Sequence, residues 1–114
     1  LRARRVRTLA GTGQKAERMR SGPGREVSLR SPWGLVRRGR TLYVAMAGSH
    51  QIWTLDLETH AVARLAGTGR ENIDDGAFAE ATFSQPSGLA LVDDRLYVAD
   101  SEVSAVRELD LSGG

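Results

Sequence analysis

Few side chains in this sequence have the chemistry of a catalyst. The 114 residues include no cysteine, so the chain offers no thiolate nucleophile, no disulfide and no redox thiol of its own. The two histidines, His50 and His60, have a spacing that matches no zinc-binding pattern, and no catalytic constellation surrounds them. We interpret both as surface residues and predict no catalytic residue.

Two further motifs invite a ligand-binding interpretation. Asp74-Asp75-Gly76 has the start of a calcium loop but lacks the later ligands and the bidentate glutamate, so a turn is the better assignment. Gly11-Thr12-Gly13 and Gly67-Thr68-Gly69 resemble phosphate-binding loops but lack the following Gly-Lys-Ser/Thr and open no long helix. We therefore predict no metal ion and no cofactor.

Charge is distributed unevenly along the chain. Residues 1–57 hold twelve Lys/Arg and three Asp/Glu, a net charge of +9, whereas residues 58–114 hold four and eleven, a net charge of −7. The basic half suits nucleic acid, an anionic partner or the acidic half of a neighbouring copy. Solvated arginines with no binding role are the alternative.

The elements that position these residues repeat along the chain. A shift of 54 residues places Leu42-Tyr43-Val44-Ala45 on Leu96-Tyr97-Val98-Ala99, and Leu55-Asp56-Leu57 on Leu109-Asp110-Leu111. The same shift places Gly22, Pro32, Gly34 and Leu35 on Gly76, Pro86, Gly88 and Leu89. The two Gly-Thr-Gly motifs align at a shift of 56 instead, which places a loop of variable length between them and the next glycine.

Each repeat unit predicts short β-strands. Alternating residues of 42–46 are apolar on both faces of a strand, which indicates a sheet covered on both sides. Pro32 and Pro86 restart the chain as a strand, residues 77–81 predict about one helical turn, and Phe83 points inward. Tyr43, Tyr97, Phe83 and Trp33 are expected in the core. The predicted strands are 34–36, 42–46, 51–57, 61–66, 88–92, 96–99 and 105–111, with 6–10 as a further fourth strand.

Four antiparallel strands per unit, repeated and buried on both faces, predict the blades of an all-β β-propeller. We divide the chain into 1–13, the outer strand of a preceding blade; 14–69, a first complete unit; and 70–114, a second unit without its last strand. About two units make only part of a ring. We expect either a segment of a longer protein or copies that associate head to tail, three of which supply six blades.

The order Ala-Gly-Thr-Gly, Asp-Gly, Ala-x-Phe-x-x-Pro-x-Gly-Leu-Ala, Leu-Tyr-Val-Ala-Asp and Val-Arg-x-Leu-Asp-Leu resembles the NHL-repeat propellers. The segments 47–53 and 99–107 resemble, more narrowly, the propeller of proteins that join a thioredoxin-like domain to NHL repeats. This resemblance implies a non-catalytic interaction scaffold within a larger redox protein. Its structural residues would be Gly11, Gly67, Gly76, Phe83, Pro32, Pro86, Tyr43 and Tyr97.

In such propellers the loops between the second and third strands and those between blades share one face. Asp100 stands where NHL repeats commonly carry a carboxylate that accepts backbone N–H groups, whereas the first unit has Met46 there. Variable loops on a repeated frame are where binding is expected. The predicted partner-binding residues are Arg18, Arg20, Arg25, Arg30, Met46, His50, Asp100 and Glu102, within a rim that also holds Lys15, Glu71, Asp74 and Asp75.

The expected partners are the remaining blades or other copies of this chain, together with an unidentified protein or small ligand. One alternative is an RNA-binding propeller that uses the arginines of loop 14–31; Trp53 is then the aromatic left over for base stacking. Another is a propeller enzyme with a site on the central axis, for which Asp100 is the one candidate. No segment predicts a membrane span, and among compartments the cytoplasm is favoured.

Overall fold

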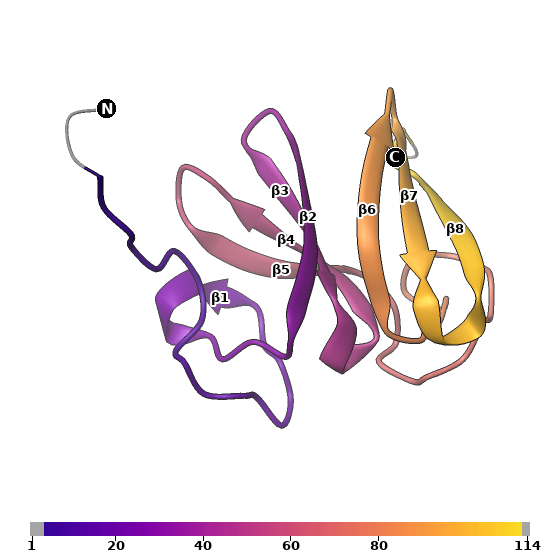
Figure 1. The fold of residues 1–114 in the computed structure, drawn as a ribbon, viewed down its shortest axis with the longest axis horizontal. Coiled ribbons are helices and arrows are strands. Elements are labelled where there is room, and N and C mark those ends of the chain that lie inside the picture. Colours follow the sequence, from indigo (N-terminus) through magenta and orange to yellow (C-terminus); the bar gives the residue numbers. More distant parts are fainter. Residues whose placement is uncertain (1–3, 113–114) are drawn as a thin grey trace.

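A computed structural model describes residues 4–112, which form two antiparallel sheets side by side (Figure 1). The first, blade 1, has the strand order β1-β5-β4-β3-β2, and the second, blade 2, has the order β6-β7-β8. The strands are β1 Gly22–Pro23, β2 Pro32–Arg38, β3 Thr41–Met46, β4 Gln51–Asp56, β5 Ala61–Ala66, β6 Pro86–Val92, β7 Arg95–Asp100 and β8 Ala105–Asp110. Three short 3-10 helices complete the elements: η1 Gly24–Glu26, η2 Ala47–Ser49 and η3 Ser101–Val103.

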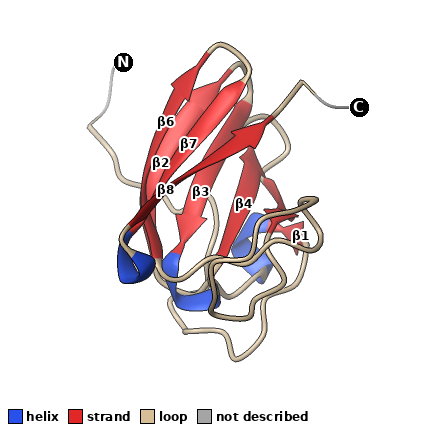
Figure 2. Cartoon of the chain, turned by 90° about the vertical axis from the view of Figure 1, so that its right-hand side faces the viewer, coloured by secondary structure: helices blue, strands red, loops and turns tan. Residues whose placement is uncertain are grey.

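The predicted all-β architecture of partial propeller blades is confirmed. Seven of the predicted strands are present, and their registers repeat at the same shift of 54: Leu42 pairs with Leu55 as Leu96 pairs with Leu109. Both inner strands start at the expected prolines, Pro32 and Pro86, and both are bulged just after them. Figure 2 shows the sheets one behind the other, with the short helices at the same end.

One hydrophobic core joins the two blades. Tyr43, Ala45 and Ile52 of blade 1 form a cluster with residues of blade 2, and all of its members are at most 5% exposed. The other members are Leu96, Val98 and Leu109 of blade 2, Phe83 of the loop before β6, and Ala66 at the end of β5. Since burial of apolar surface stabilises a protein by about 25 cal/mol per Å², this shared core holds the blades together.

The inner strands of the two blades approach to backbone contact. A Cβ atom built on Gly34 in β2 would lie 2.2 Å from the carbonyl oxygen of Ser87 in β6. Only glycine permits that distance. Its repeat equivalent, Gly88, faces the side of blade 2 that no described strand covers, and there a Cβ atom would meet nothing nearer than Ala99 Cβ at 3.6 Å.

Three sequence expectations differ from the structure. Residues 6–10 form no strand, because the described chain supplies no sheet for them to join, and Val6 is fully exposed. Trp33 lies on edge strand β2 beside its bulge and is 71% exposed, so its placement in the core was wrong. Tyr97 is only partly buried, whereas Tyr43 is buried, because blade 2 covers Tyr43 and no described strand covers Tyr97.

The other structural residues lie as expected. Phe83 is 2% exposed, and the N–H of Ala81 donates to the carbonyl oxygen of Ala77 at 2.8 Å, which makes the single predicted turn. Gly11, Gly67 and Gly76 all have positive φ. At Gly67, where φ is 102°, an added Cβ would also lie 2.9 Å from the His50 carbonyl oxygen, so a larger residue fits neither the conformation nor the space. No helix among residues 4–112 is long enough to cross a membrane.

We predict that Gly34→Ala lowers the free energy of unfolding by about 1–3 kcal/mol, because the added methyl group overpacks the contact between β2 and β6. The matched control is Gly88→Ala, at the same position of the second unit, which should be tolerated because its Cβ meets an ordinary contact. Urea denaturation of the 114-residue chain measures both. Equal losses in the two variants would contradict the backbone contact.

Candidate functional site

The connecting loops gather at one end of the two sheets, which we call the loop face (Figure 1). It consists of residues 11–31 before β2, η2 between β3 and β4, residues 67–85 before β6, and η3 between β7 and β8. The two Gly-Thr-Gly motifs lie at its start in each unit. The predicted common face of inter-blade and second-to-third-strand loops is therefore present in the structure.

In blade 2 the loop face is held by a buried ion pair, Asp100 and Arg107, which we call the clamp. The Asp100 carboxylate is fully buried; it accepts the Ser84 N–H at 2.8 Å and an Arg107 N–H at 2.9 Å. Arg107 also donates to the carbonyl oxygens of Thr82 and Asp74, at 2.8 and 3.0 Å, and to the Asp75 carboxylate at 2.9 Å. Its guanidinium lies 5.0 Å from the centre of the Phe83 ring. The clamp thus fixes the loop before β6.

Blade 1 has an apolar pair where blade 2 has the clamp. The shift of 54 places Met46 on Asp100 and Trp53 on Arg107, and both side chains are buried, at 1% and 3% exposure. They pack together with Val44. The indole N–H donates to Gln51 Oε1 at 2.8 Å, and Gln51 Nε2 donates to the Gly67 carbonyl oxygen at 3.2 Å. The indole N–H of Trp53 and the amide of Gln51 therefore both have hydrogen-bond partners inside the chain.

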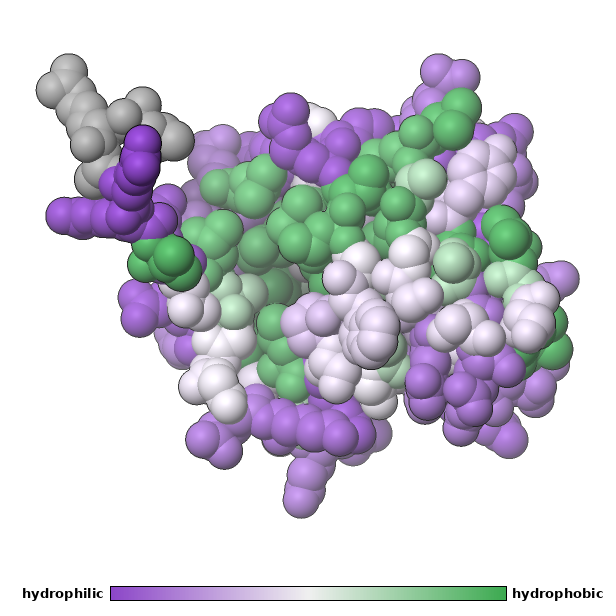
Figure 3. Space-filling view, in the orientation of Figure 1, coloured by the Kyte–Doolittle hydropathy of each residue, from purple (hydrophilic) through white to green (hydrophobic). Residues whose placement is uncertain are grey.

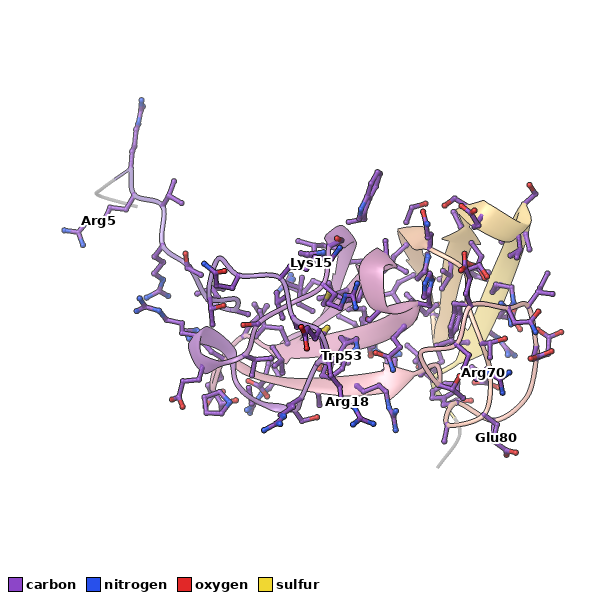
Figure 4. The ribbon with its side chains drawn as sticks, turned by 90° about the horizontal axis from the view of Figure 1, so that it is seen from below. Arg5, Lys15, Arg18, Trp53, Arg70 and Glu80 are labelled. Carbon is purple, nitrogen blue, oxygen red and sulfur yellow. The ribbon has the colours of Figure 1, made fainter. Side chains whose placement is uncertain are left out.

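Beside this apolar pair lies a pocket of about 560 Å³ on the loop face. It is lined by Arg18 and Arg30 of the loop before β2, by His50 after η2 and by Arg64 of β5, and we call it the cationic pocket. Figure 4 views the chain from the loop side and shows Arg18 near Trp53, with Arg70 and Glu80 farther off in the loop before β6. Glu17, Met19, Ser21, Gly48, Ser49, Gln51, Trp53, Thr68 and Gly69 complete the lining.

The structure sorts the predicted binding residues into three groups. Arg18, Arg30 and His50 line the cationic pocket. Arg20, Arg25 and Glu102 are exposed elsewhere on the loops. The remaining two, Met46 and Asp100, are buried, so we replace their predicted binding role with a structural one. Asp100 does accept a backbone N–H, as expected.

The sequence prediction misplaced both tryptophans and missed one arginine. Trp53, the expected stacking residue for RNA, is buried, and the exposed tryptophan is Trp33. Arg64 was missed. It lies opposite Trp53 in the β4–β5 register, which runs without a break from the Leu55–Val62 pair to the Trp53–Arg64 pair. Its one sequence signal is a cation within the otherwise apolar alternation of Val62 and Ala66.

Comparison with known proteins identifies the repeat. Residues 83–109 match the model of the NHL repeat. The chain carries an NHL repeat. It is 37% identical to the human NHL repeat-containing protein 2 over the whole chain, which is 19% of that protein, and 40% identical to the Arabidopsis thaliana protein SUPPRESSOR OF QUENCHING 1, chloroplastic, over 96% of the chain and 11% of that protein. The NHL chain thus spans less than a fifth of each of these relatives.

Solved structures show the same fold. An auxiliary nutrient binding protein of Bacteroides thetaiotaomicron matches with a TM-score of 0.75 and 21% identity, over 88% of this chain and 27% of that one. A second protein of that organism, of unknown function, matches with a TM-score of 0.78 and 22% identity, over 89% and 26%. This chain therefore covers about a quarter of each of these two solved chains and corresponds to part of a larger fold. Among residues 4–112, no three His, Asp or Glu side chains gather as a metal site.

We predict that Asp100→Asn lowers the free energy of unfolding by about 3 kcal/mol, because it leaves the buried Arg107 without its buried counter-charge. The matched control is Asp110→Asn, whose carboxylate pairs with the exposed Arg95 at 3.1 Å and should cost far less. Thermal or urea unfolding measures both. Similar losses in the two variants would contradict the structural role of the clamp.

Proposed function

We propose that this NHL chain is a non-catalytic scaffold whose two outer sheet faces receive further NHL blades, while its loop face meets a protein or small-ligand partner. The proposal rests on one observation: the positions that form the interface between blade 1 and blade 2 recur, by the sequence repeat, on the outer faces of both blades. At equivalent positions of the repeat, each outer face presents apolar residues that correspond to one half of the contact between blade 1 and blade 2.

The trailing face is the outer side of blade 2, formed by Ala90, Tyr97, Ala99 and Val106. Their equivalents in blade 1 are Val36, Tyr43, Ala45 and Ile52, all of which pack in the core between the blades. On the trailing face Val106 is 79% exposed, and the Glu108 carboxylate beside Tyr97 raises the pKa of its phenol. This face is therefore apolar and largely exposed, and its positions are equivalent to those of the blade 1 surface that blade 2 covers.

The leading face is the outer side of blade 1, formed by Leu35, Leu42, Val44 and Leu55. Their equivalents, Leu89, Leu96, Val98 and Leu109, are the residues with which blade 2 packs on blade 1. Leu9, Ala10 and Leu29 cover part of the leading face, and a groove of about 330 Å³ remains there. Leu35 is 58% exposed, and Figure 3 shows hydrophobic side chains gathered over β2 and β3.

A leading face and a trailing face are thus complementary, and a second copy of the chain is a direct probe for them. Such a contact is head to tail, so each molecule uses one face of each kind.

We further propose, from the resemblance of segments 47–53 and 99–107, that the blades belong to a longer protein with a thioredoxin-like domain. Its gene would encode a Cys-x-x-Cys or similar motif outside this segment.

The test is complementation between two face variants. Leu35→Lys disables the leading face and Val106→Lys the trailing face, so each variant alone should associate at least about tenfold more weakly than the wild-type chain, since a buried unpaired lysine is costly. Mixed one to one, they keep one intact face each and should form a two-chain complex that does not grow. Sedimentation velocity measures the species.

Val6→Lys is the matched control, because Val6 is fully exposed and lies on neither face. It should leave association unchanged. A wild-type chain that stays monomeric at about 100 µM, or a mixture that forms no two-chain complex, would contradict the proposal.

A further inference from the structure

The two units treat charge on the loop face in opposite ways. In blade 2 the buried cation, Arg107, is neutralised within the chain by Asp100 and Asp75. The shift of 54 replaces these two carboxylates with Met46 and Ser21 in blade 1, and it places Arg20 on Asp74. Blade 1 therefore has cations on its loop face without the acids that accompany them in blade 2.

The arginines of the cationic pocket lack ionic partners. Among residues 4–112, Arg18, Arg30 and Arg64 take part in no ion pair. The one acidic residue in the lining is Glu17, and its contact with Arg30 is through the backbone carbonyl oxygen, which accepts an Arg30 N–H at 3.2 Å. Three guanidinium groups around one pocket raise the local concentration of anions.

Arg30 has an unused hydrogen-bond donor. Its Nε–H is buried and has no acceptor. An unpaired buried donor is costly, more so on a charged group. A ligand oxygen in the pocket would remove that cost once the guanidinium turns toward it, so the wall of the pocket is incomplete without an acceptor.

His50 supplies a further donor. Its Nδ1 accepts the Gln85 N–H at 3.1 Å, so the proton of the neutral imidazole is on Nε2. Gln51 and Trp53, also in the lining, use their polar atoms on each other and on Gly67. The side-chain nitrogen groups left at the pocket are therefore the donors of Arg18, Arg30, Arg64 and His50.

We propose that the cationic pocket binds a compact multivalent oxyanion, a ligand with closely spaced phosphate or carboxylate groups. Arginine forks match both groups with paired hydrogen bonds. In blade 2 the chain provides these oxygens itself, through Asp100 and Asp75; in blade 1 the ligand provides them. The inference rests on the proposed scaffold function and names the ligand class of its loop face.

The experiment titrates the Trp33→Phe variant of the full chain, in which Trp53 is the single tryptophan and its fluorescence reports on the pocket. Trp33 is exposed and lies outside the lining, so its replacement leaves the pocket intact. Inorganic pyrophosphate and citrate are the two probes, which separate a preference for phosphate from one for carboxylate. At low ionic strength we expect saturable binding of at least one of them.

In this background Arg30→Gln should weaken binding of that probe by about tenfold or more, and Arg18→Gln or Arg64→Gln by about threefold, since each removes a charge-assisted hydrogen bond. The matched control is Arg70→Gln, an arginine of the same loop face outside the lining, which should change the affinity by less than about twofold. Far-UV circular dichroism verifies that each variant is folded.

Three results would overturn the inference: no binding of either probe up to about 10 mM, equal effects of Arg30→Gln and Arg70→Gln, or binding of single-stranded RNA without binding of either small anion. The last would assign the arginines to a nucleic-acid surface. None of these results changes the complementation between leading and trailing faces, so failure of the ligand inference is distinguishable from failure of the scaffold proposal.

Discussion

Backbone contact between the inner strands β2 and β6 is the constraint from which the rest of the arrangement follows. Because Gly34 has no side chain, the Ser87 carbonyl oxygen reaches the space that a Cβ would occupy. That approach brings Tyr43 and Ala45 of one sheet against Leu96 and Val98 of the other and closes a shared core. It also aligns the two sheets so that their loops emerge at one end, where the cationic pocket lies.

On this common frame the two blades fill equivalent buried positions with different kinds of side chain. Blade 2 buries Asp100 with Arg107, and blade 1 buries Met46 with Trp53 at the equivalent positions. The exchange is consistent with measurements on other proteins, in which a buried ion pair replaced as a unit by apolar residues often costs no stability. In blade 1 both members of the ion pair are replaced, the acid by Met46 and the cation by Trp53. With that carboxylate absent, the cations of the blade 1 loops can face a ligand.

The strands could be predicted from sequence because they depend on local alternation and on a repeat that is visible at a shift of 54. The structural role of Asp100 followed from the family resemblance, and its partner Arg107 did not, since the two are brought together only by pairing of β7 with β8. Trp33 and Trp53 were exchanged because exposure depends on which strand is an edge strand, a property of the assembled sheet. Arg64 was missed because its place beside Trp53 depends on the register in which β5 pairs with β4, and no sequence pattern marks that register.

The missing strand at 6–10 has a related cause. A strand needs a partner with free backbone groups, and the alternation of the sequence does not say whether the chain supplies one. Residues 6–10 were predicted as the outer strand of a preceding blade, and the described residues form no sheet of that blade. Local pattern therefore predicts which segments favour a strand, and the neighbouring blades decide which of them form one.

The most direct measurement of the central claim is native-state amide hydrogen exchange as a function of urea. If the core between the blades makes one cooperative unit, the amides of Tyr43 and Ala45 in β3 and of Leu96 and Val98 in β7 will share one free energy of opening. Opening of β6–β8 at a clearly lower free energy, with β3 still protected, would show that the sheets fold separately and would contradict the account.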